Sequence, residues 1–345
     1  MFAAGHVSVL STDPVERKAV DGREPMIQRE SPTFSEFLDR TREEPVYVIL
    51  GVQGSGTNLL IRLLRRIFNF SILRDRSLVF NAAARLGAAP SPDAVAREIG
   101  HVKAHLFPST LTRKRTRFAI RDNKHFAGFE PELISRRVSS GAELARLVYA
   151  YRAFSSGTSR MGVKSDDIWE NIGAIDEVIP NRRIVLITRD FRDNLVSITG
   201  KPWGPVEPLQ AAHYVKKRFA PYAVEYRRVG RRGFHVKFST LVTSTRKFVD
   251  DFSSHFDLTP SEDPDAVIKA FNFRPGKIDK WRRLPADQLT WCEGILYDEM
   301  VEFGYTPLSP APALPGPLNT SAAVVRDTLR RVPQKLQTLV RMIQR

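Results

Sequence analysis

Short apolar runs along the chain have the pattern of buried strands. Residues 46–50 read Val-Tyr-Val-Ile-Leu, and residues 184–188 read Ile-Val-Leu-Ile-Thr. Uninterrupted β-branched and apolar residues over this length are typical of parallel strands that are covered on both faces. A third candidate strand is 234–238, which reads Phe-His-Val-Lys-Phe. These runs predict a sheet inside the protein.

Apolar residues at helical spacing follow the strands. After Asn58 one helical face carries Leu59, Leu60, Leu63, Leu64 and Ile67. Further helices are predicted at about 34–40, 191–197, 241–256 and 286–303. Residues 70–160 read mostly as helix and loop. Strands that alternate with helices predict an α/β fold, with three layers (α/β/α) and a mostly parallel central sheet.

The composition divides the chain into four segments. Residues 1–43 are polar and predict an N-terminal arm, and residues 44–305 carry the α/β pattern. Five prolines predict an extended linker over residues 306–319. Residues 320–345 predict a basic amphipathic helix. Its apolar positions are Val325, Leu329, Val332, Leu336, Leu339 and Ile343. We favour packing of this helix on the domain or on a second subunit, with peripheral contact to an anionic membrane as the alternative.

The charge balance indicates anionic partners. The chain has 53 lysines and arginines against 38 acidic residues, a formal charge of +15. We find no nucleic-acid-binding motif, so nucleic acid is not an expected partner. The single cysteine, Cys292, fits a reducing compartment. There is neither a bilayer-spanning apolar run nor a secretory signal pattern, which predicts a cytoplasmic protein. The histidines lack metal-ligand spacing, so no metal is expected.

A glycine-rich segment joins the first strand to its helix. It reads Gly51-Val52-Gln53-Gly54-Ser55-Gly56-Thr57-Asn58. Glycines let a loop turn several N–H groups inward, and the helix that follows adds its own free N–H groups and the positive end of its dipole. This arrangement predicts a phosphate-binding loop in which Gln53, Gly54, Ser55, Gly56, Thr57 and Asn58 surround the ligand.

The loop does not match the pattern of nucleotide triphosphatases. That pattern places a lysine directly after the last glycine, followed by serine or threonine. Here Thr57 and Asn58 occupy these two places. Without the lysine and the magnesium-binding hydroxyl, a kinase or an ATPase is disfavoured.

A second candidate anion site follows the strand at 184–188. The strand ends in Arg189-Asp190-Phe191-Arg192-Asp193 and runs into a helix that carries Ser197. A guanidinium group and a hydroxyl near a helix N-terminus suit a dianionic phosphate. The alternative is a salt-bridge cluster on the surface, and Asp190, Arg192 and Asp193 are expected to brace the loop.

Both elements resemble those of sulfotransferases that use 3′-phosphoadenosine-5′-phosphosulfate (PAPS). Gly54-Ser55-Gly56-Thr57 is similar to the family's 5′-phosphosulfate loop, and residues 182–197 closely resemble its 3′-phosphate element. The resemblance implies that Arg189 and Ser197 bind the 3′-phosphate of PAPS and of the product 3′-phosphoadenosine-5′-phosphate (PAP). The family's usual basic residue is replaced by Gly54, so a cation must come from elsewhere.

The resemblance extends to the end of the α/β segment. Residues 276–284, with Lys280-Trp281-Arg282, and then Gly304-Tyr305 are similar to the family's closing segment. This similarity implies that a basic loop covers the nucleotide. Its candidate residues are Arg274, Lys277 and Lys280, whereas Trp281 is expected to be a packing anchor.

Two further resemblances suggest catalytic residues. His101-Val102-Lys103-Ala104-His105-Leu106 resembles the family's Lys-Thr-His-Leu element, which implies His105 as general base and Lys103 as a cationic helper. Residues 161–167 resemble a Gly-x-Lys-Thr/Ser element, in which Lys164 would supply the charge missing at Gly54 and Asp166 or Asp167 is an alternative base. The competing interpretation of this stretch is a solvated helix start capped by Asp166.

The sequence therefore predicts transfer of a sulfuryl group from PAPS to a hydroxyl or amine. The large middle region and the basic tail favour a carbohydrate or lipid-type acceptor. The alternative is a non-catalytic protein of the same fold that binds a nucleotide or a glycan, and Gly54 supports it.

Overall fold

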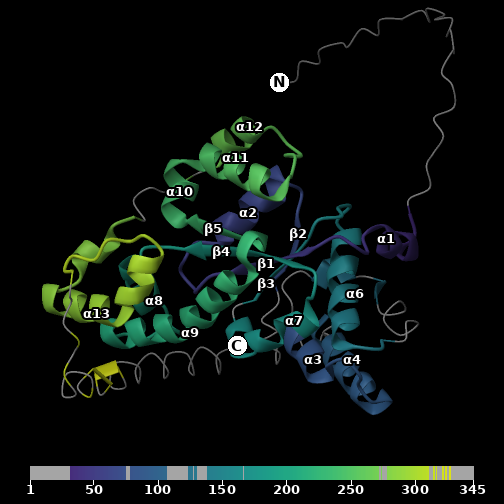
Figure 1. Cartoon of the computed structure of the whole chain (residues 1–345), viewed down its shortest axis with the longest axis horizontal. Helices are drawn as coiled ribbons and strands as arrows, with labels where there is room; N and C mark the ends of the chain where they lie inside the picture. The colour runs from purple at the N-terminus through teal and green to yellow at the C-terminus, as the bar shows by residue number, and fades with distance from the viewer. Residues whose placement is uncertain are drawn as a thin grey trace, which may run out of the picture.

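A computed structural model gives the structure of most of the chain. The residues that it describes are 32–74, 78–106, 123–126, 128–129, 138–165, 167–271, 273, 278–310, 314, 316, 321, 323–324 and 326–327. Within these ranges five strands form one parallel sheet, in the order β2-β3-β1-β4-β5 (Figure 1). The strands are β1 (Val46–Leu50), β2 (Ser71–Arg74), β3 (Met161–Lys164), β4 (Arg182–Thr188) and β5 (Gly233–Lys237).

Strand β1 lies at the centre of the sheet and sets its register. Ile49 pairs with Lys164 of β3, and Leu50 pairs with Leu186 of β4. On the far side of β4, Thr188 pairs with Lys237 of β5. Because all the strands are parallel, their carboxyl ends meet at one edge of the sheet, which is where ligands bind in folds of this class.

Helices cover both faces of the sheet. Along β1 successive side chains point to opposite faces, so Val48 and Ile49 belong to separate hydrophobic clusters. The cluster on one face includes side chains of α2 (Thr57–Ile67), α10 (Phe238–Thr243), α11 (Thr245–Phe256) and α12 (Pro264–Ala270). The cluster on the opposite face includes side chains of α1 (Phe34–Arg40), α3 (Leu78–Leu86), α4 (Pro92–Leu106), α6 (Gly141–Phe154), α7 (Ile175–Val178), α8 (Phe191–Thr199), α9 (Pro208–Val229) and α13 (Ala286–Glu302). The predicted three-layer α/β/α architecture is confirmed (Figure 1).

Short 3-10 helices connect several of these elements. They are η1 (Asn123–Phe126), η2 (Ile168–Glu170), η3 (Ile172–Ala174), η4 (Gly230–Arg232) and η6 (Lys280–Arg283). Of these, η2 packs on α9 and η6 packs on α8.

The structure corrects the interpretation of residues 161–167 as a solvated helix start. Met161–Lys164 is strand β3, every residue of which is buried. The stretch is only four residues long and contains Gly162 and Lys164, so it lacks a strand pattern of its own. Its pairing with β1 on one side and β2 on the other makes it a strand.

Two predictions about helices also need correction. The helix expected over 241–256 is broken at Ser244, so that α10 ends at Thr243 and α11 begins at Thr245. The 22-residue helix α9 was not predicted, because Pro221 lies within it and charged residues interrupt its apolar face. The first turn of helix α10 begins at Phe238, which the sequence had assigned to a strand.

The beginning of the C-terminal tail contacts the domain. The Asp327 carboxylate accepts hydrogen bonds from the N–H groups of Val206 and Glu207, at 2.5 and 3.1 Å, at the N-terminus of α9. Ala323 is fully buried. The apolar positions that we predicted for the tail helix lie outside the described residues, so membrane contact by the tail stays a prediction. None of the helices in the described ranges has the length and apolar character needed to cross a bilayer.

At the amino end of the sheet, a network of ion pairs joins strand β4 to helices α7 and α9. Arg182, the first residue of β4, is 1% exposed. Its guanidinium group donates to Glu225 of α9 at 2.9 and 2.8 Å and to Asp176 of α7 at 2.7 Å. Arg228 pairs with the same two carboxylates. The network fixes the position of α9 relative to β4.

Replacement of Arg182 tests this role. Because Arg182→Met leaves buried Glu225 short of a partner, we expect the free energy of unfolding to fall by about 3 kcal/mol. The control Arg66→Met removes an exposed pair with Glu262, 3.1 Å apart, and should cost less than about 1 kcal/mol. Urea unfolding measures both values, and equal losses would contradict the assignment.

Candidate active site

The glycine-rich loop, residues Gly51–Asn58, leaves β1 at the carboxyl edge of the sheet and enters α2. Gly54 and Gly56 have φ angles of +93° and +97°, which favour glycine. Gly56 is the N-cap of α2, so no side chain caps the helix, and the first turn contains no acidic residue. The positive end of α2 therefore faces the loop without an internal counter-charge, and this suits an anion.

The loop packs tightly against two neighbouring elements. A Cβ on Gly56 would lie 2.3 Å from Cδ2 of Phe238, the first residue of α10. A Cβ on Gly54 would lie 3.2 Å from the hydroxyl oxygen of Ser197 on α8. A side chain at position 54 would therefore have to adopt a positive φ angle and displace Ser197 by a few tenths of an ångström, so this position favours glycine over the expected basic residue.

Arg189 links the loop to the second predicted anion site. It follows β4 directly and is 5% exposed. Its Nη1 donates to the Gly54 carbonyl at 3.2 Å, and its guanidinium carbon lies 4.9 Å from the Phe238 ring centroid. Ser197 lies beside Gly54, so the structure brings together Gly54, Arg189 and Ser197. A single ligand with two phosphate groups could occupy both anion sites only if they lie close together, as they do here.

The remaining loop residues take different positions. Ser55 is buried, and its hydroxyl accepts a hydrogen bond from Asn194 of α8 at 3.2 Å. Thr57 is buried in the first turn of α2, and Asn58 is exposed. The Gln53 side chain accepts a hydrogen bond from the hydroxyl of Tyr214 on α9. Residues 53–58 therefore contact α8 and α9 as well as the sheet.

The charged residues after Arg189 brace the site. Arg192 donates to Asp190 at 2.9 and 2.6 Å and to Glu293 of α13 at 2.8 Å. Its guanidinium group also stacks 4.1 Å from the ring centroid of Trp281, which is buried. These contacts agree with the bracing role expected for Asp190 and Arg192 and with the anchoring role expected for Trp281.

Asp193 holds residues 278–284, the first described part of the closing segment, against α8. Its two carboxylate oxygens accept from the N–H groups of Asp279 and Trp281 at 3.1 and 3.2 Å. Arg189 Nη2 lies 3.4 Å from the same carboxylate. Burial raises the pKa of Asp193, although Arg189 opposes the shift. One carboxylate thus connects the closing segment to Arg189. The candidates Arg274 and Lys277 lie outside the described residues and stay predictions.

A buried polar chain supports Arg189 from the sheet side. The Thr188 hydroxyl lies 2.7 Å from His235 Nε2 and 2.9 Å from the Tyr305 hydroxyl. Burial lowers the pKa of His235 to about 4, and Lys237 adds to the effect, so the imidazole is neutral near neutral pH. Burial also raises the pKa of Tyr305. The sequence indicated the Gly304-Tyr305 pair but gave no signal for His235.

The predicted catalytic residues fall in two places. Lys164 is buried at the carboxyl end of β3, where it pairs with Ile49, two residues before the glycine-rich loop begins. Lys103 and His105 instead lie in the last turn of α4, which packs against α3. The His105 Nδ1 lies 2.7 Å from the carbonyl oxygen of His101 in the previous turn.

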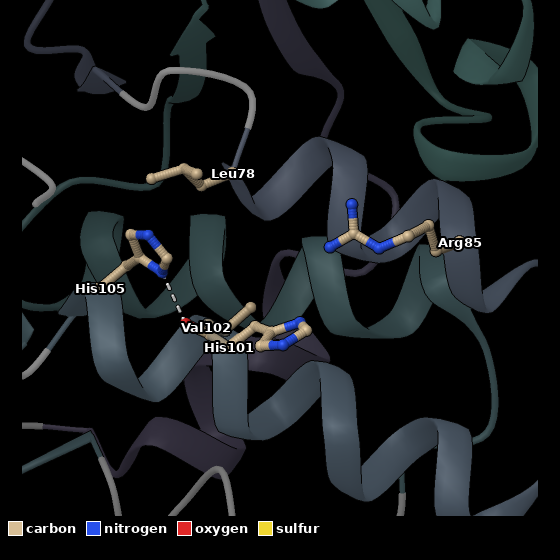
Figure 2. Close-up of a pocket in the computed structure, with 5 residues that line it drawn as sticks. All are labelled: Leu78, Arg85, His101, Val102 and His105. Carbon is tan, nitrogen blue, oxygen red and sulfur yellow. Dashed lines mark hydrogen bonds between the residues drawn. The ribbon is translucent and has the colours of Figure 1, made fainter. Parts of the chain in front are cut away.

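His105 borders a cavity of about 260 Å³ between α3 and α4. Figure 2 shows the residues that line it: Leu78, Arg85, His101, Val102 and His105. In the part of the chain that the structure describes, no hydrogen bond or ion pair joins His105 to the glycine-rich loop. Its role as general base therefore stays a prediction.

An aromatic and basic group on α9 was missed by the sequence analysis. Beside Tyr214, the guanidinium carbon of Arg218 lies 3.7 Å from the Tyr214 ring centroid and 4.9 Å from that of Trp169 in η2. The run Lys216-Lys217-Arg218 after Tyr214 is the signal that points to this group. Across the described ranges, no three His, Cys, Asp or Glu side chains gather in a way that would hold a metal ion.

One protein family and several solved structures match the chain. The sequence profile of the sulfotransferase family matches residues 45–263, more than half of the chain. The solved sulfotransferase domain from the Synechococcus PCC 7002 olefin synthase is 16% identical, with a TM-score of 0.45, over 70% of this chain and 88% of that one. No curated protein sequence matches the chain.

Two further solved structures are similar to the chain at low identity. The sulfotransferase domain from the curacin biosynthetic pathway is 13% identical, with a TM-score of 0.48, over 79% of this chain and 99% of that one. Sulfotransferase STF9 from Mycobacterium avium is 12% identical, with a TM-score of 0.44, over 79% of this chain and 80% of that one.

Alanine in place of Gly56 tests the close packing of the loop. Gly56→Ala adds a methyl group that clashes with Phe238 and also strains a positive φ angle, so we expect a loss of about 3 kcal/mol in the free energy of unfolding. The control Gly87→Ala has a φ of +62° and open space, and should lose about 1 kcal/mol. Equal losses in urea unfolding would show that Phe238 does not crowd the loop.

Acid titration tests the buried state of His235. A histidine in the unfolded chain has a pKa of about 6.5, whereas burial lowers the pKa of His235 to about 4. The unfolded chain therefore binds the extra proton first, and stability is lost as the pH falls from about 6.5 toward 4. We expect this group to cost about 2 kcal/mol between pH 7 and pH 5. His235→Gln should lose less stability than wild type over this interval, and identical pH slopes would refute the prediction.

Proposed function

The chain belongs to the sulfotransferase family, and we propose that it transfers a sulfuryl group from PAPS to a hydroxyl or amine of an acceptor. The observation that carries this proposal is the contact of Gly54 with Arg189 and Ser197. Two elements that are far apart in the sequence, each suited to one phosphate, lie at the same edge of the sheet. A nucleotide that carries one phosphate group at its 5′ position and another at its 3′ position matches this pair of sites.

The residues present fit this donor in shape and charge. The glycine-rich loop and the uncapped first turn of α2 would hold the 5′-phosphosulfate through backbone N–H groups. Arg189 and Ser197 would hold the 3′-phosphate through a guanidinium fork and a hydroxyl. Arg274 and Lys277 are the proposed covering residues. PAPS supplies an activated sulfuryl group, and the chain has to position it and neutralise the negative charge left on the nucleotide.

Lys164 is the proposed source of the positive charge that Gly54 lacks. It ends β3, the strand beside β1, and so lies at the same edge of the sheet as the glycine-rich loop. An ammonium group in a buried position acts more strongly on a neighbouring anion than one in water, because the local dielectric constant is lower. This placement supports a transfer reaction even though position 54 carries no cation.

Fewer contacts in the structure bear on the acceptor and on the base that would deprotonate it. We propose a carbohydrate or lipid-type acceptor, with His105 as the base and Lys103 as its helper. Their position on α4, beside a cavity, would require the acceptor to extend toward α3 and α4. Asp166 or Asp167 is the alternative base, since both follow Lys164 closely at the end of β3; Asp166 lies outside the described residues.

The second candidate function is non-catalytic binding of a nucleotide or glycan. The geometry at Gly54 supports it, because the positive φ angle and the nearby Ser197 hydroxyl favour glycine over a basic residue there. Incubation with radiolabelled PAPS and a panel of hydroxyl acceptors separates the two functions. Consumption of PAPS that depends on an acceptor supports the transferase, whereas PAP binding without consumption supports the non-catalytic alternative.

Calorimetric titration with PAP and AMP tests the nucleotide site. Because a hydrogen bond to a charged group contributes about 1.5–3 kcal/mol, we expect PAP to bind at least about 10-fold more tightly than AMP. Arg189→Ala should abolish this difference while it leaves AMP binding nearly unchanged. Ser197→Ala should reduce the difference to a smaller extent.

The control for lost charge is Arg183→Ala, on β4, the strand that Arg189 follows. The Arg183 guanidinium carbon lies 5.9 Å from the ring centroid of Phe256, away from the glycine-rich loop. Circular dichroism confirms that each variant is folded. Equal affinities for PAP and AMP in the wild-type protein would disprove the proposed donor.

A further inference from the structure

Helix α9 carries a group of side chains that the nucleotide contacts leave unused. Tyr214 donates to Gln53 of the glycine-rich loop, so this part of α9 lies directly beside the candidate active site. One helical turn further, Arg218 lies over the rings of both Tyr214 and Trp169, with its guanidinium carbon 3.7 and 4.9 Å from the two centroids. Lys217 lies 5.5 Å from the Trp169 centroid.

Arg218 lacks an acidic partner among the described residues. It forms no ion pair with a carboxylate there, and its buried Nε atom has no hydrogen-bond partner. In contrast, Lys216, two residues earlier, donates to the Ile295 carbonyl at 2.8 Å and lies 3.6 Å from Glu299. Arg227, further along the same helix, pairs with Glu302 at 2.8 Å. The lack of an acidic partner therefore sets Arg218 apart from neighbouring cations of α9.

The stacking of Arg218 orients its donors. The rings of Tyr214 and Trp169 lie over the guanidinium group, and the N–H groups of a guanidinium lie in its plane and point outward from its edge. Stacking therefore fixes the group without using its hydrogen-bonding capacity, and a planar fork of this kind suits a carboxylate or phosphate. Arg218, Tyr214 and Trp169 are all partly exposed, and Lys217 is exposed, so a ligand can reach them.

We propose that Arg218 and Lys217 form an acceptor subsite for an anionic group, so that the acceptor is a hydroxyl compound that carries a carboxylate or a phosphate. This inference rests on the proposed function and narrows its acceptor class. The Tyr214–Gln53 hydrogen bond places the subsite next to the loop at which the sulfuryl group would be held. The anion would orient the acceptor, and the hydroxyl elsewhere on the same molecule would face the loop.

Binding of simple sugars to PAP-saturated protein tests the subsite without any turnover. The probes are glucose 6-phosphate, glucuronate and the neutral methyl glucoside, titrated by calorimetry. We expect at least one anionic sugar to bind about 10-fold or more tightly than methyl glucoside, and the two anionic probes distinguish a phosphate from a carboxylate preference.

Variants of α9 assign the effect to these residues. Arg218→Gln should lower the affinity for the anionic sugar about 10-fold and leave PAP binding unchanged. Lys217→Gln, at an exposed position, should lower it about three-fold. The matched control Arg227→Gln removes the same charge from the same helix and should change nothing. An unaltered affinity in Arg218→Gln, equal affinities for neutral and anionic sugars, or no binding of any probe would each overturn the subsite.

The same titrations separate the two proposals. If PAP does not bind, the proposed nucleotide function fails, and the anionic sugars are then titrated into the protein without PAP. Anionic-sugar binding that is lost in Arg218→Gln would still support the anion subsite by itself. Normal PAP binding with no effect of Arg218→Gln would leave the sulfotransferase proposal intact and refute the subsite.

Discussion

The parallel pairing of β1 with β3 and β4 is the constraint on which the candidate site depends. It places the carboxyl ends of three strands side by side, so that the residues after each strand emerge at one edge. Gly51 follows β1, Ser165 follows β3 and Arg189 follows β4. With antiparallel neighbours, these residues would lie at opposite ends of the sheet. The contact between Arg189 and Gly54 is therefore a consequence of topology.

At this edge of the sheet, buried charged residues hold neighbouring segments in position. Asp193 receives two backbone N–H groups of the closing segment and lies against Arg189, while Arg192 joins Asp190, Glu293 and the Trp281 ring. Burial of charged groups is costly unless they are paired and hydrogen-bonded, and each of these residues is. Paired in this way, they orient Arg189 and hold the closing segment beside it.

Helix α9 connects the site to the rest of the molecule. The N–H groups of the two residues before it bond to Asp327 in the tail, Tyr214 bonds to the glycine-rich loop, and Glu225 pairs with Arg182 at the amino end of β4. A helix held at three points along 22 residues presents Arg218 in a fixed place. The beginning of the tail is thus part of the framework that positions the proposed acceptor subsite.

Elements whose signals are local could be predicted from the amino-acid sequence alone. Strands β1, β4 and β5, the glycine-rich loop and the Arg189–Ser197 motif could be predicted, because apolar runs and glycine spacing reflect the conformation of each segment alone. The fold made Met161–Lys164 a strand, brought His235 to Thr188, and brought Tyr214, with Arg218 over its ring, to the glycine-rich loop. It also placed His105 on α4 beside a separate cavity. Those features arise from contacts between residues far apart in the chain, and such pairings leave no periodic trace in the sequence.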